Sequence, residues 1–569
     1  MATTIPGSCE NSNIANLSLP YCFDMNVNIH NNAVVQNSSL GDELFSSTPA
    51  GAGGVTLCNG SDYYKFNNNW VCGNMSTGDG GGVVHLGFTK NGDIEHNVIL
   101  FNQSTNPTIT TNGGGLLVMG APDQDPPCGT TTDQDCLSPP NTISPSDGTG
   151  PGLVINANLI MGNSADSGSG GGLRLQHING TDVLNFPNGS QCNASLTSSN
   201  CHWNTVRVTN NIIANNVAGW DGAGVSLQDA LAVNIVNNTI VSNDSTASSG
   251  VLFGSLFAPL ASTPGPATGV NCSTNTLEQS CPQVSGLVSV TNSAVLSANL
   301  PTSGLTCPVG HGNADSCRNY SVPLLTNNVI WQNRSFYIGV GGFGDPTKNQ
   351  NQQKGVTLYN SFTTTPAVSQ ASTGACPAAS YWEIGVRGDS GPGIHSSGFT
   401  LAPTYSVLSD AADYPGANNL GSNPVLLSQY CNGSRVPPEV GGMGWEVPPG
   451  TNETNALPTP VFSLTPAATV DEGNNWINLR WGPLDMTNPK TNAVLGNYGI
   501  GGGSSAIDKA DDSVSPSTDY FGHTRPSGAE SDIGAVEFAE AAAADLDVTP
   551  SALAFGSVRN GTTSAAQFV

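Results

Sequence analysis

The stretch Val206-Arg-Val-Thr-Asn-Asn-Ile-Ile-Ala-Asn-Asn216 contains a motif that recurs along the chain, Asn-x-apolar-x-x-Asn, here at Asn211–Asn216. A short alternating strand pattern precedes the motif, and a glycine-led strand, Gly222-Ala-Gly-Val-Ser-Leu-Gln, follows it. The other copies run Asn32–Asn37, Asn69–Asn74, Asn97–Asn102, Asn158–Asn163, Asn238–Asn243 and Asn328–Asn333, with a weaker copy at Ala294–Asn299. Strand, Asn turn, Gly turn and strand, repeated at a closest spacing of 27 or 28 residues, predict the coil of a parallel β-solenoid.

The Asn and Gly residues have structural explanations. Asn tolerates left-handed turns, and its amide can bond backbone groups or stack as a ladder between coils. Glycine allows the tight bends. We therefore interpret both as parts of the repeat.

The spacing between motifs is uneven, which predicts insertions into the coils. Motifs lie 27 residues apart from Asn211 to Asn238, but 61 residues apart from Asn97 to Asn158 and 90 from Asn238 to Asn328. The insertions are expected to leave after Met119, Gln176 and Gly254. If the coils stack in register, these loops emerge from one side of the solenoid, where binding residues are expected.

Fourteen cysteines fall into six close pairs, each separated by 14 residues or fewer, and one distant pair. Zinc sites need closer spacing than this, so we favour local disulfides, although the sequence does not fix their connectivity. Disulfides form in oxidising compartments, which predicts an extracellular or cell-surface protein. The close pairs are Cys9–Cys22, Cys58–Cys72, Cys128–Cys136, Cys192–Cys201, Cys272–Cys281 and Cys307–Cys317, and the distant pair is Cys376 and Cys431.

The charge of the chain argues against several classes of partner. With 41 acidic and 15 basic residues, the net charge is −26. Phosphate backbones and anionic membrane surfaces attract clustered Lys and Arg, so neither nucleic acid nor a membrane surface is expected as a partner. No apolar run reaches the roughly 18 residues that predict a membrane span.

We divide the chain into four parts. Residues 1–26 are expected to cap the first coil, 27–345 to form parallel coils, and 346–540 to form further coils and a closing segment. The last part, 541–569, is a linker and a short segment with strand character. The predicted fold class is all-β, with loop insertions and a C-terminal β tail.

Residues 27–540 resemble secreted bacterial right-handed parallel β-helix proteins of the pectate-lyase-like superfold. The stretches Asp519-Tyr-Phe-Gly-His-Thr-Arg525 and Asp532-Ile-Gly-Ala-Val-Glu537 resemble the end of the choice-of-anchor Q group, although Val536 stands where that group usually has Tyr. The tail from Leu546 resembles the first strands of a bacterial Ig-like domain. The resemblance implies the fold, and it implies no single activity.

Candidate site residues come from the turns and insertions. Asp79, Asp166 and Asp221 precede glycine clusters and are the candidate metal ligands, for which Ca²⁺ is the fitting cation, although ordinary turn residues fit the pattern as well. No other cofactor is indicated. Arg174, expected to point outward, is a candidate base, and Arg525, Asp532 and Glu537 are expected to form a buried ion network. The candidate sugar-stacking aromatics, which can also serve as loop anchors, are Trp203, Trp220, Tyr63, Tyr64 and Phe186.

These observations favour a non-catalytic extracellular protein that binds a polysaccharide or glycan, or that assembles with itself. In the second case residues 546–569 are expected to add strands to a neighbouring copy and build a homo-polymer. A polysaccharide lyase or glycoside hydrolase is the enzymatic alternative, and a glycan-binding adhesin is a further one. Hydrolases need paired carboxylates, and the only two adjacent aspartates are Asp511-Asp512.

Overall fold

The computed structural model describes ten main segments, which carry the parallel strands, and two small hairpins. The hairpins are β17–β18 (Asn185–Phe186 and Ser190–Gln191) and β30–β31 (Asn349–Gln350 and Gln353–Lys354). The segments are 25–40, 52–58, 61–106, 110–120, 148–180, 204–249, 280–340, 356–365, 378–429 and 496–538, with short gaps at 88, 107–109, 303–304, 306 and 313–315.

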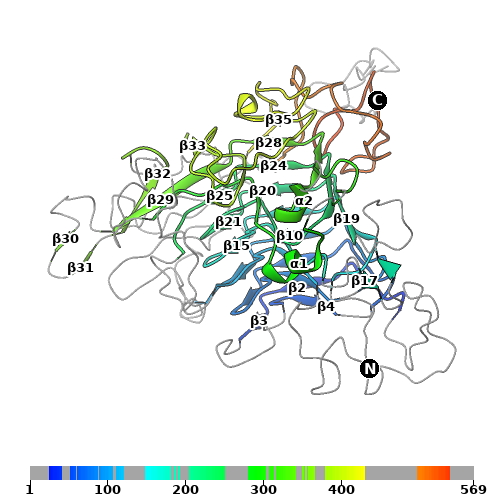
Figure 1. The fold of residues 1–569 in the computed structure, drawn as a ribbon. Coiled ribbons are helices and arrows are strands. Elements are labelled where there is room, and N and C mark those ends of the chain that lie inside the picture. The colour runs from blue at the N-terminus through cyan, green and yellow to red at the C-terminus, as the bar shows by residue number, and fades with distance from the viewer. Residues whose placement is uncertain are drawn as a thin grey trace, which may run out of the picture.

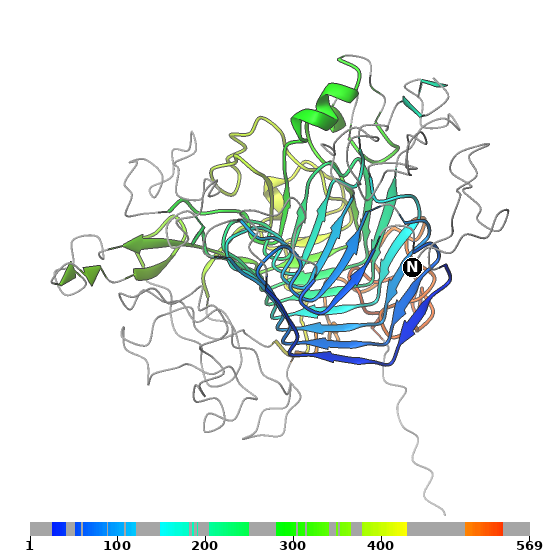
Figure 2. The same ribbon diagram turned by 90° about the horizontal axis from the view of Figure 1, so that it is seen from below.

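Four sheets built mainly from parallel strands make up this part of the chain, in a solenoid-like array (Figure 1). The chain visits each sheet in turn and returns to the first, as β9, β10, β11 and β12 show. Figure 2 looks along the stack from its N-terminal side. The predicted mostly-β fold with parallel sheets is thus confirmed.

Sheets 1 and 2 each contain short strands stacked in register. Sheet 1 contains β1 (Asn28–His30), β5 (Lys65–Asn67), β9 (Asp93–Glu95), β13 (Leu153–Asn156), β19 (Thr205–Thr209), β23 (Ala232–Val236) and β27 (Leu324–Thr326). Sheet 2 contains β2 (Ala33–Val35), β6 (Trp70–Cys72), β10 (Val98–Leu100), β14 (Leu159–Met161), β20 (Ile212–Ala214), β24 (Thr239–Val241), β28 (Val329–Trp331) and β35 (Val407–Leu408).

Sheets 3 and 4 complete each coil, and a hairpin arm of β29 and β32 extends from sheet 3 (Figure 1). Sheet 3 contains β3 (Ser38–Ser39), β7 (Met75–Ser76), β11 (Gln103–Ser104), β15 (Ser164–Ala165), β21 (Val217–Ala218), β25 (Asp244–Ser245), β29 (Arg334–Val340), β32 (Val356–Asn360) and β33 (Ser380–Tyr381). Sheet 4 contains β4 (Val55–Leu57), β8 (Val83–Leu86), β12 (Leu116–Met119), β16 (Leu173–Gln176), β22 (Val225–Leu227), β26 (Leu287–Ser289) and β34 (Ile384–Val386).

The interior of the stack is an apolar column built from the alternation within each strand. In β10 the central Ile99 points inward, whereas Val98 and Leu100 point outward toward a separate apolar cluster. The inward residue of β10 pairs with Ile160 of β14, which pairs in turn with Ile213 of β20. Because side chains alternate between the two faces of a strand, this register keeps one apolar side chain per strand in the column.

Two ladders of Asn side chains run up the corners on either side of sheet 2. Asn216 Oδ1 accepts hydrogen bonds from Asn163 N at 3.0 Å and Asn163 Nδ2 at 2.9 Å. Its own Nδ2 donates to Ile160 O and to Asn243 Oδ1, both at 3.0 Å. The same bonds repeat from Asn32 to Asn328 in one ladder and from Asn37 to Asn333 in the other. The recurrent motif is therefore one ladder Asn, a three-residue strand, a corner residue and the second ladder Asn.

The left-handed corner position belongs to the residue before each ladder Asn. In the coil that contains β20, Asn210 and Asn215 have φ of 55° and 56° and precede Asn211 and Asn216. Equivalent corners are occupied by His96 and Phe101, so the position tolerates several residue types. Of the two roles considered for the motif Asn, the amide ladder is the one that the structure shows.

The weak motif copy at Ala294–Asn299 is not a coil. These residues form α1 (Ala294–Asn299), whose N-cap Ser293 accepts a hydrogen bond from Leu296 N at 3.1 Å. A second helix, α2 (Ser316–Asn319), follows in the same insertion, and a short 3-10 helix, η4 (Ala411–Asp413), lies beyond β35. Among the described residues, no helix is long and apolar enough to cross a membrane.

The insertions leave the stack at two corners, so the prediction of a single wall needs correction. Residues 121–147 and 181–203 connect sheet 4 to sheet 1, as does the segment between β26 and β27. Residues 250–279, by contrast, connect β25 of sheet 3 to β26 of sheet 4. Cysteines 272 and 281 therefore belong to a different corner from Cys307 and Cys317.

The structure tests two of the predicted cysteine pairs. Cys307 and Cys317 form a disulfide with a Cα–Cα distance of 5.7 Å, as predicted. Cys58 and Cys72 are both free thiols, so the pair predicted there is wrong. The reason is that Cys58 follows β4 of sheet 4, whereas Cys72 ends β6 of sheet 2.

The remaining disulfide predictions are not decided. Cys281 is disulfide-bonded, but its partner is outside the described residues. The other cysteines of the predicted set lie outside them as well: Cys9, Cys22, Cys128, Cys136, Cys192, Cys201, Cys272, Cys376 and Cys431.

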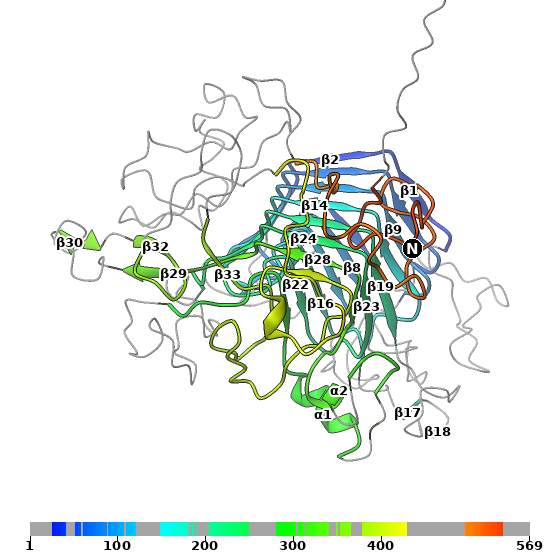
Figure 3. The same ribbon diagram turned by 90° about the horizontal axis from the view of Figure 1, so that it is seen from above.

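The closing segment 496–538 packs along the outer face of sheet 2 (Figure 3). Tyr498, Ile533 and Ala535 are buried there with the outward side chains of sheet 2, such as Met161. Asn237 Nδ2 donates to Asp532 O at 3.0 Å, and Ala535 N donates to the Thr239 hydroxyl at 3.0 Å. These bonds attach the segment to the corner residues of several coils.

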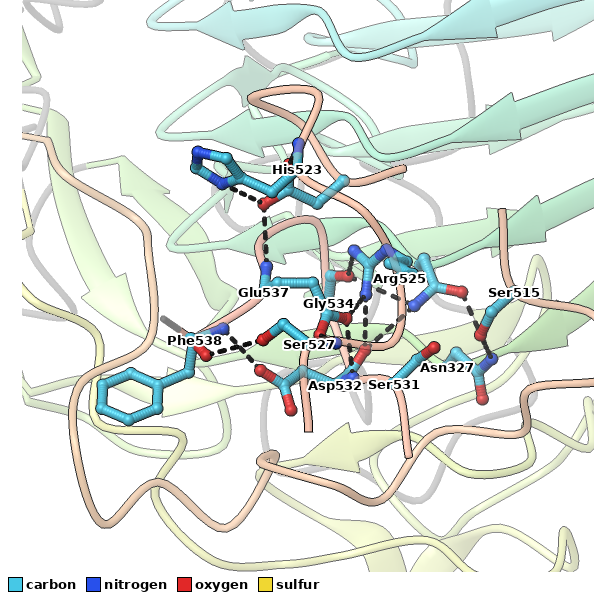
Figure 4. A network of polar contacts seen from close by, with 12 residues as sticks. Asn327, Ser515, His523, Arg525, Ser527, Ser531, Asp532, Gly534, Glu537 and Phe538 are labelled. Carbon is cyan, nitrogen blue, oxygen red and sulfur yellow. Dashed lines mark hydrogen bonds and ion pairs between the residues drawn. The ribbon is translucent and has the colours of Figure 1, made fainter. Parts of the chain in front are cut away.

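A buried Arg525–Glu537 ion pair organises this segment (Figure 4). Arg525 also donates to Asp532 O at 3.0 Å and Gly534 O at 2.8 Å. Glu537 accepts from Asp532 N at 2.9 Å. The predicted network is thus confirmed for Arg525 and Glu537. The Asp532 carboxylate instead accepts backbone N–H groups from Asp508 at 2.8 Å and Phe538 at 2.5 Å, and burial raises its pKa to about 6.

Replacing Asn216 with Ala should destabilise the stack by roughly 2–5 kcal/mol, because it leaves the buried Asn163 N–H and Ile160 carbonyl groups without their partner. Denaturant unfolding followed by circular dichroism measures the loss. Asn37→Ala is the matched control, since Asn37 occupies the exposed end of the same ladder, and it should cost about 1 kcal/mol or less. Equal losses for both variants would contradict the ladder as a source of stability.

The two free thiols should differ in reactivity. Cys58 is exposed, whereas Cys72 is buried and burial raises its pKa to about 11. A maleimide should therefore label Cys58 in the native, unreduced protein and Cys72 only after denaturation. Peptide mass spectrometry identifies the labelled sites. If neither thiol is labelled in unreduced, denatured protein, the predicted Cys58–Cys72 disulfide would be supported instead.

Candidate functional site

A strip of polar side chains crosses the outer face of sheet 4. In β16, Leu173 and Leu175 point into the core, so Arg174 and Gln176 stand on the outer face. In the next coil Ser226 pairs with Arg174, and Gln228 follows two residues later. We define the polar strip as Ser169, Arg174, Gln176, Asp221, Ser226 and Gln228.

Apolar side chains border the polar strip on both sides along the stack. Toward the N-terminal coils, Val84, Leu117 and Met119 form one buried cluster. Toward the C-terminal coils, Val288 and Val290 belong to another cluster. The outer face of sheet 4 therefore changes from apolar to polar and back within a few coils, which marks the strip as a specialised place on a repetitive scaffold.

Arg174 is held rigidly at the centre of the polar strip. It donates to Gln176 Oε1 at 3.0 Å, to the Ser226 hydroxyl at 2.6 Å and to Gln228 Oε1 at 2.5 Å. Its side chain is 3% exposed, and burial lowers its pKa to about 10, as does nearby Arg387. Its outward position agrees with the sequence analysis. Its bonds fix the guanidinium as a donor, so the structure gives no support to Arg174 as a base.

Arg387 and Asp221 close one edge of the strip. Arg387 donates Nε to Asp221 Oδ2 at 2.7 Å and Nη2 to Oδ1 at 2.8 Å, a paired contact that fixes both planes. Ser169 donates to Asp221 Oδ1 at 2.5 Å and accepts from Arg387 at 2.9 Å. Asp221 is buried, whereas the Arg387 side chain is 22% exposed. The pair therefore presents a partly exposed Arg387 guanidinium that the buried Asp221 carboxylate holds in place.

Trp220 covers this ion pair with its ring. The Arg387 guanidinium carbon lies 3.5 Å from the Trp220 ring centre, a close cation–π contact. Trp220 also packs against the buried Tyr337 and Tyr359, whose rings stack at 5.3 Å on the arm formed by β29 and β32. Aromatic surface and polar strip thus meet at Trp220, at the corner between sheets 3 and 4.

Two further acidic groups border the strip. Asp79 accepts from Asn112 N at 2.6 Å and from Gln176 Nε2 at 3.3 Å. Burial raises its pKa, and the Asn112 N–H and the charge of Arg174 oppose that shift. At the other edge of sheet 4, Asp229 contacts His177 Nδ1 at 2.9 Å and accepts from Ser293 N at 2.6 Å.

The three predicted calcium ligands do not lie together. Asp79 and Asp221 occupy equivalent turns, connected through Asn112 and Ser169 by backbone hydrogen bonds from the following glycines. Asp166 lies three residues before Ser169, next to sheet 3, where its carboxylate contacts Gln103 and Ser164. The expected alignment of Asp166 with the other two is wrong. In the described part of the chain, no group of three or more His, Cys, Asp or Glu residues is arranged to hold a metal ion.

The predicted sugar-stacking aromatics are dispersed. Tyr63 is 38% exposed and lies beside Lys90. Tyr64 is 1% exposed and contacts His85 Nδ1 at 2.8 Å in the core, so it is not available to a surface ligand. Trp203 and the side chain of Phe186 lie outside the described residues. Of the three candidates whose side chains are described, only Trp220 borders the polar strip.

The sequence analysis missed Arg387, Gln176 and Gln228. A signal for the two glutamines was present, because Leu-Arg-Leu-Gln176 and Val-Ser-Leu-Gln228 occupy the same place in successive glycine-led strands. Arg387 carried no such signal, since it is 166 residues from Asp221 in the chain and reaches it only through the stacking of coils.

No protein-family model matches the chain, and no similar curated protein or solved structure was found.

Proposed function

We propose that the protein is an extracellular structural or interaction protein that binds a polysaccharide or glycan at the polar strip. The observation that carries this proposal is the contact of Trp220 with the Arg387–Asp221 pair beside Arg174, Gln176 and Gln228. Sugar rings present apolar C–H faces and pairs of hydroxyl groups. An indole ring suits the first, and the partly exposed Arg387 guanidinium and Gln228 amide suit the second.

The fold that we propose is a right-handed parallel β-helix of the pectate-lyase-like kind. The strand order of the four sheets supports this fold, because the chain returns to each sheet once per coil. Connections between parallel strands of one sheet are right-handed in nearly all proteins, which favours that hand here. The resemblance of residues 27–540 to secreted β-helix proteins also supports this fold. The Cys307–Cys317 disulfide supports the extracellular location, since disulfides accumulate in oxidising compartments.

Binding explains the polar strip better than a lyase or hydrolase does. Arg174, the candidate base, already donates to three side-chain acceptors, and both carboxylate oxygens of Asp221 are engaged by Arg387. Self-assembly through residues 546–569 stays a prediction, because those residues are outside the described part of the chain.

Trp220→Ala should weaken glycan binding roughly tenfold, or about 1.4 kcal/mol, because it removes the aromatic face at the edge of the strip. Affinity electrophoresis against a panel of neutral, acidic and acetylated polysaccharides measures the change. Trp70→Ala is the matched control, since Trp70 is a 40% exposed tryptophan on sheet 2, away from the strip. Retention of all binding by the Trp220 variant would refute this site.

The same polysaccharides separate binding from turnover. The proposed function predicts complexes without new reducing ends or unsaturated uronates. Product formation that disappears in Asp221→Asn would establish the enzymatic alternative in place of the binding protein.

A further inference from the structure

The second Asn ladder ends in a carboxyl group. Asn333, its last member, donates its backbone N–H to Glu383 Oε2 at 3.2 Å and its amide to the same oxygen at 2.5 Å. Glu383 thus occupies the place of the next ladder Asn. Because a carboxylate lacks the N–H that an Asn amide donates onward, Glu383 accepts the bonds of the ladder but cannot continue it.

Glu383 is buried against a second acid, Asp410, which precedes η4. Glu383 Oε1 and Asp410 Oδ1 are both buried without a hydrogen-bond partner of good geometry, although the Ser409 hydroxyl is near the Glu383 carboxyl and backbone N–H groups are near that of Asp410. The Glu383 backbone N–H donates a hydrogen bond to the Asp410 carboxyl, and the charge of Asp410 raises the electrostatic cost of ionising Glu383. Two ionised carboxylates in this position would leave two buried oxygens without a donor.

The Tyr414 hydroxyl group contacts both β34 and Asp410. Tyr414 Oη donates to Ile384 O at 2.8 Å and accepts from Ile384 N at 3.1 Å. Its single proton can instead be donated to Asp410 Oδ2, which lies 3.2 Å from the same oxygen. Both contacts are hydrogen bonds at the same time only when Asp410 carries a proton and donates it to Tyr414 Oη.

We propose that Glu383 and Asp410 form a proton-binding site that retains at least one proton at neutral pH and fastens the last coils to the second Asn ladder. One proton on the pair neutralises one buried carboxyl and supplies a further donor beside the two oxygens that have no hydrogen bond of good geometry. Loss of that proton favours opening of β34 and β35, because an opened segment lets water hydrate the charged carboxylates.

The charges around the pair favour the same conclusion. Asp413 faces Asp410 and raises its pKa further, and Ser409 and Tyr414 contribute hydrogen bonds. The nearby cation Arg334 is engaged by Asp244 at 2.7 and 2.5 Å, and His395 contacts Asp389 at 3.6 Å. Burial, followed by the neighbouring acid, raises the pKa of Glu383 to about 8 and that of Asp410 to about 7.

The sign of the pH dependence follows from these raised pKa values. Protonated acids are favoured in the folded state, so the stabilisation is complete below the ordinary carboxyl pKa of about 4. It falls as the pH rises from there through about 8, where the folded pair ionises. The last coils should therefore loosen in mildly alkaline solution while the earlier coils stay closed.

Glu383→Gln tests the proposal, because the glutamine keeps an acceptor for Asn333 and places an N–H donor where the proton is proposed. Hydrogen exchange by mass spectrometry is compared at equal pH for peptides that cover residues 384–408. The open population rises about tenfold for each pH unit between the ordinary carboxyl pKa of about 4 and the folded pKa of about 8, and is constant above it. At pH 9 these amides should therefore exchange at least tenfold faster in the unmodified chain than in the variant. At pH 4 the two chains should agree.

Controls keep the outcome unambiguous. Glu530→Gln, at an exposed carboxylate, should behave as the unmodified chain does at every pH. If the Gln variant fails to fold, Asp410→Asn replaces it, and infrared spectroscopy should show a carboxylic acid band at pH 7 that the variant lacks. Equal exchange of unmodified and Glu383→Gln chains at pH 9, or no such band at pH 7, would overturn the proposal.

Discussion

The Asn ladders are the interaction on which this architecture depends. Each coil turns sharply on both sides of sheet 2, and a sharp buried turn leaves backbone N–H and C=O groups that the sheets cannot pair. An Asn amide answers both needs, because its oxygen accepts from the coil before and its nitrogen donates to a carbonyl and to the next Asn. Stacking identical amides therefore satisfies the corners and fixes the register of neighbouring coils together.

This constraint also explains where the chain varies. The two ladder positions are separated by one three-residue strand and one corner residue, which leaves no room for additional chain between sheets 1, 2 and 3. The large insertions accordingly join sheet 4 to sheet 1 or sheet 3 to sheet 4. The outer face of sheet 2 is left for the closing segment, which is attached through corner residues such as Asn237 and Asn327. The first ladder ends at Ser406, which accepts from Asn328, and the second ends at Glu383, which accepts from Asn333. Each ladder therefore stops where the next side chain is not an Asn amide.

The polar strip shows how a repetitive scaffold becomes specific at one place. Sheet 4 needs only its inward side chains to build the core, so its outward positions are free to differ from coil to coil. In β8, β12 and β26 they are apolar, whereas in β16 and β22 they carry a connected set of guanidinium, amide and hydroxyl groups. The groups are held by one another and by Arg387, which makes this part of sheet 4 rigid.

The sequence by itself determined the parallel repeat, the strand positions and the inward face of each strand, because these depend on residues only a few positions apart. It also placed Asp79 and Asp221 in equivalent turns and Arg174 on the outward face of its strand. It misplaced Asp166 and the Cys58–Cys72 pair, since a count of residues does not show at which corner a turn occurs. The weak copy at Ala294–Asn299 failed because six residues fit a helix as well as a coil. The contacts of Arg387 with Asp221, and of Glu383 with the ladder, were decided only by the tertiary structure, because stacking brings together residues that are far apart in the chain.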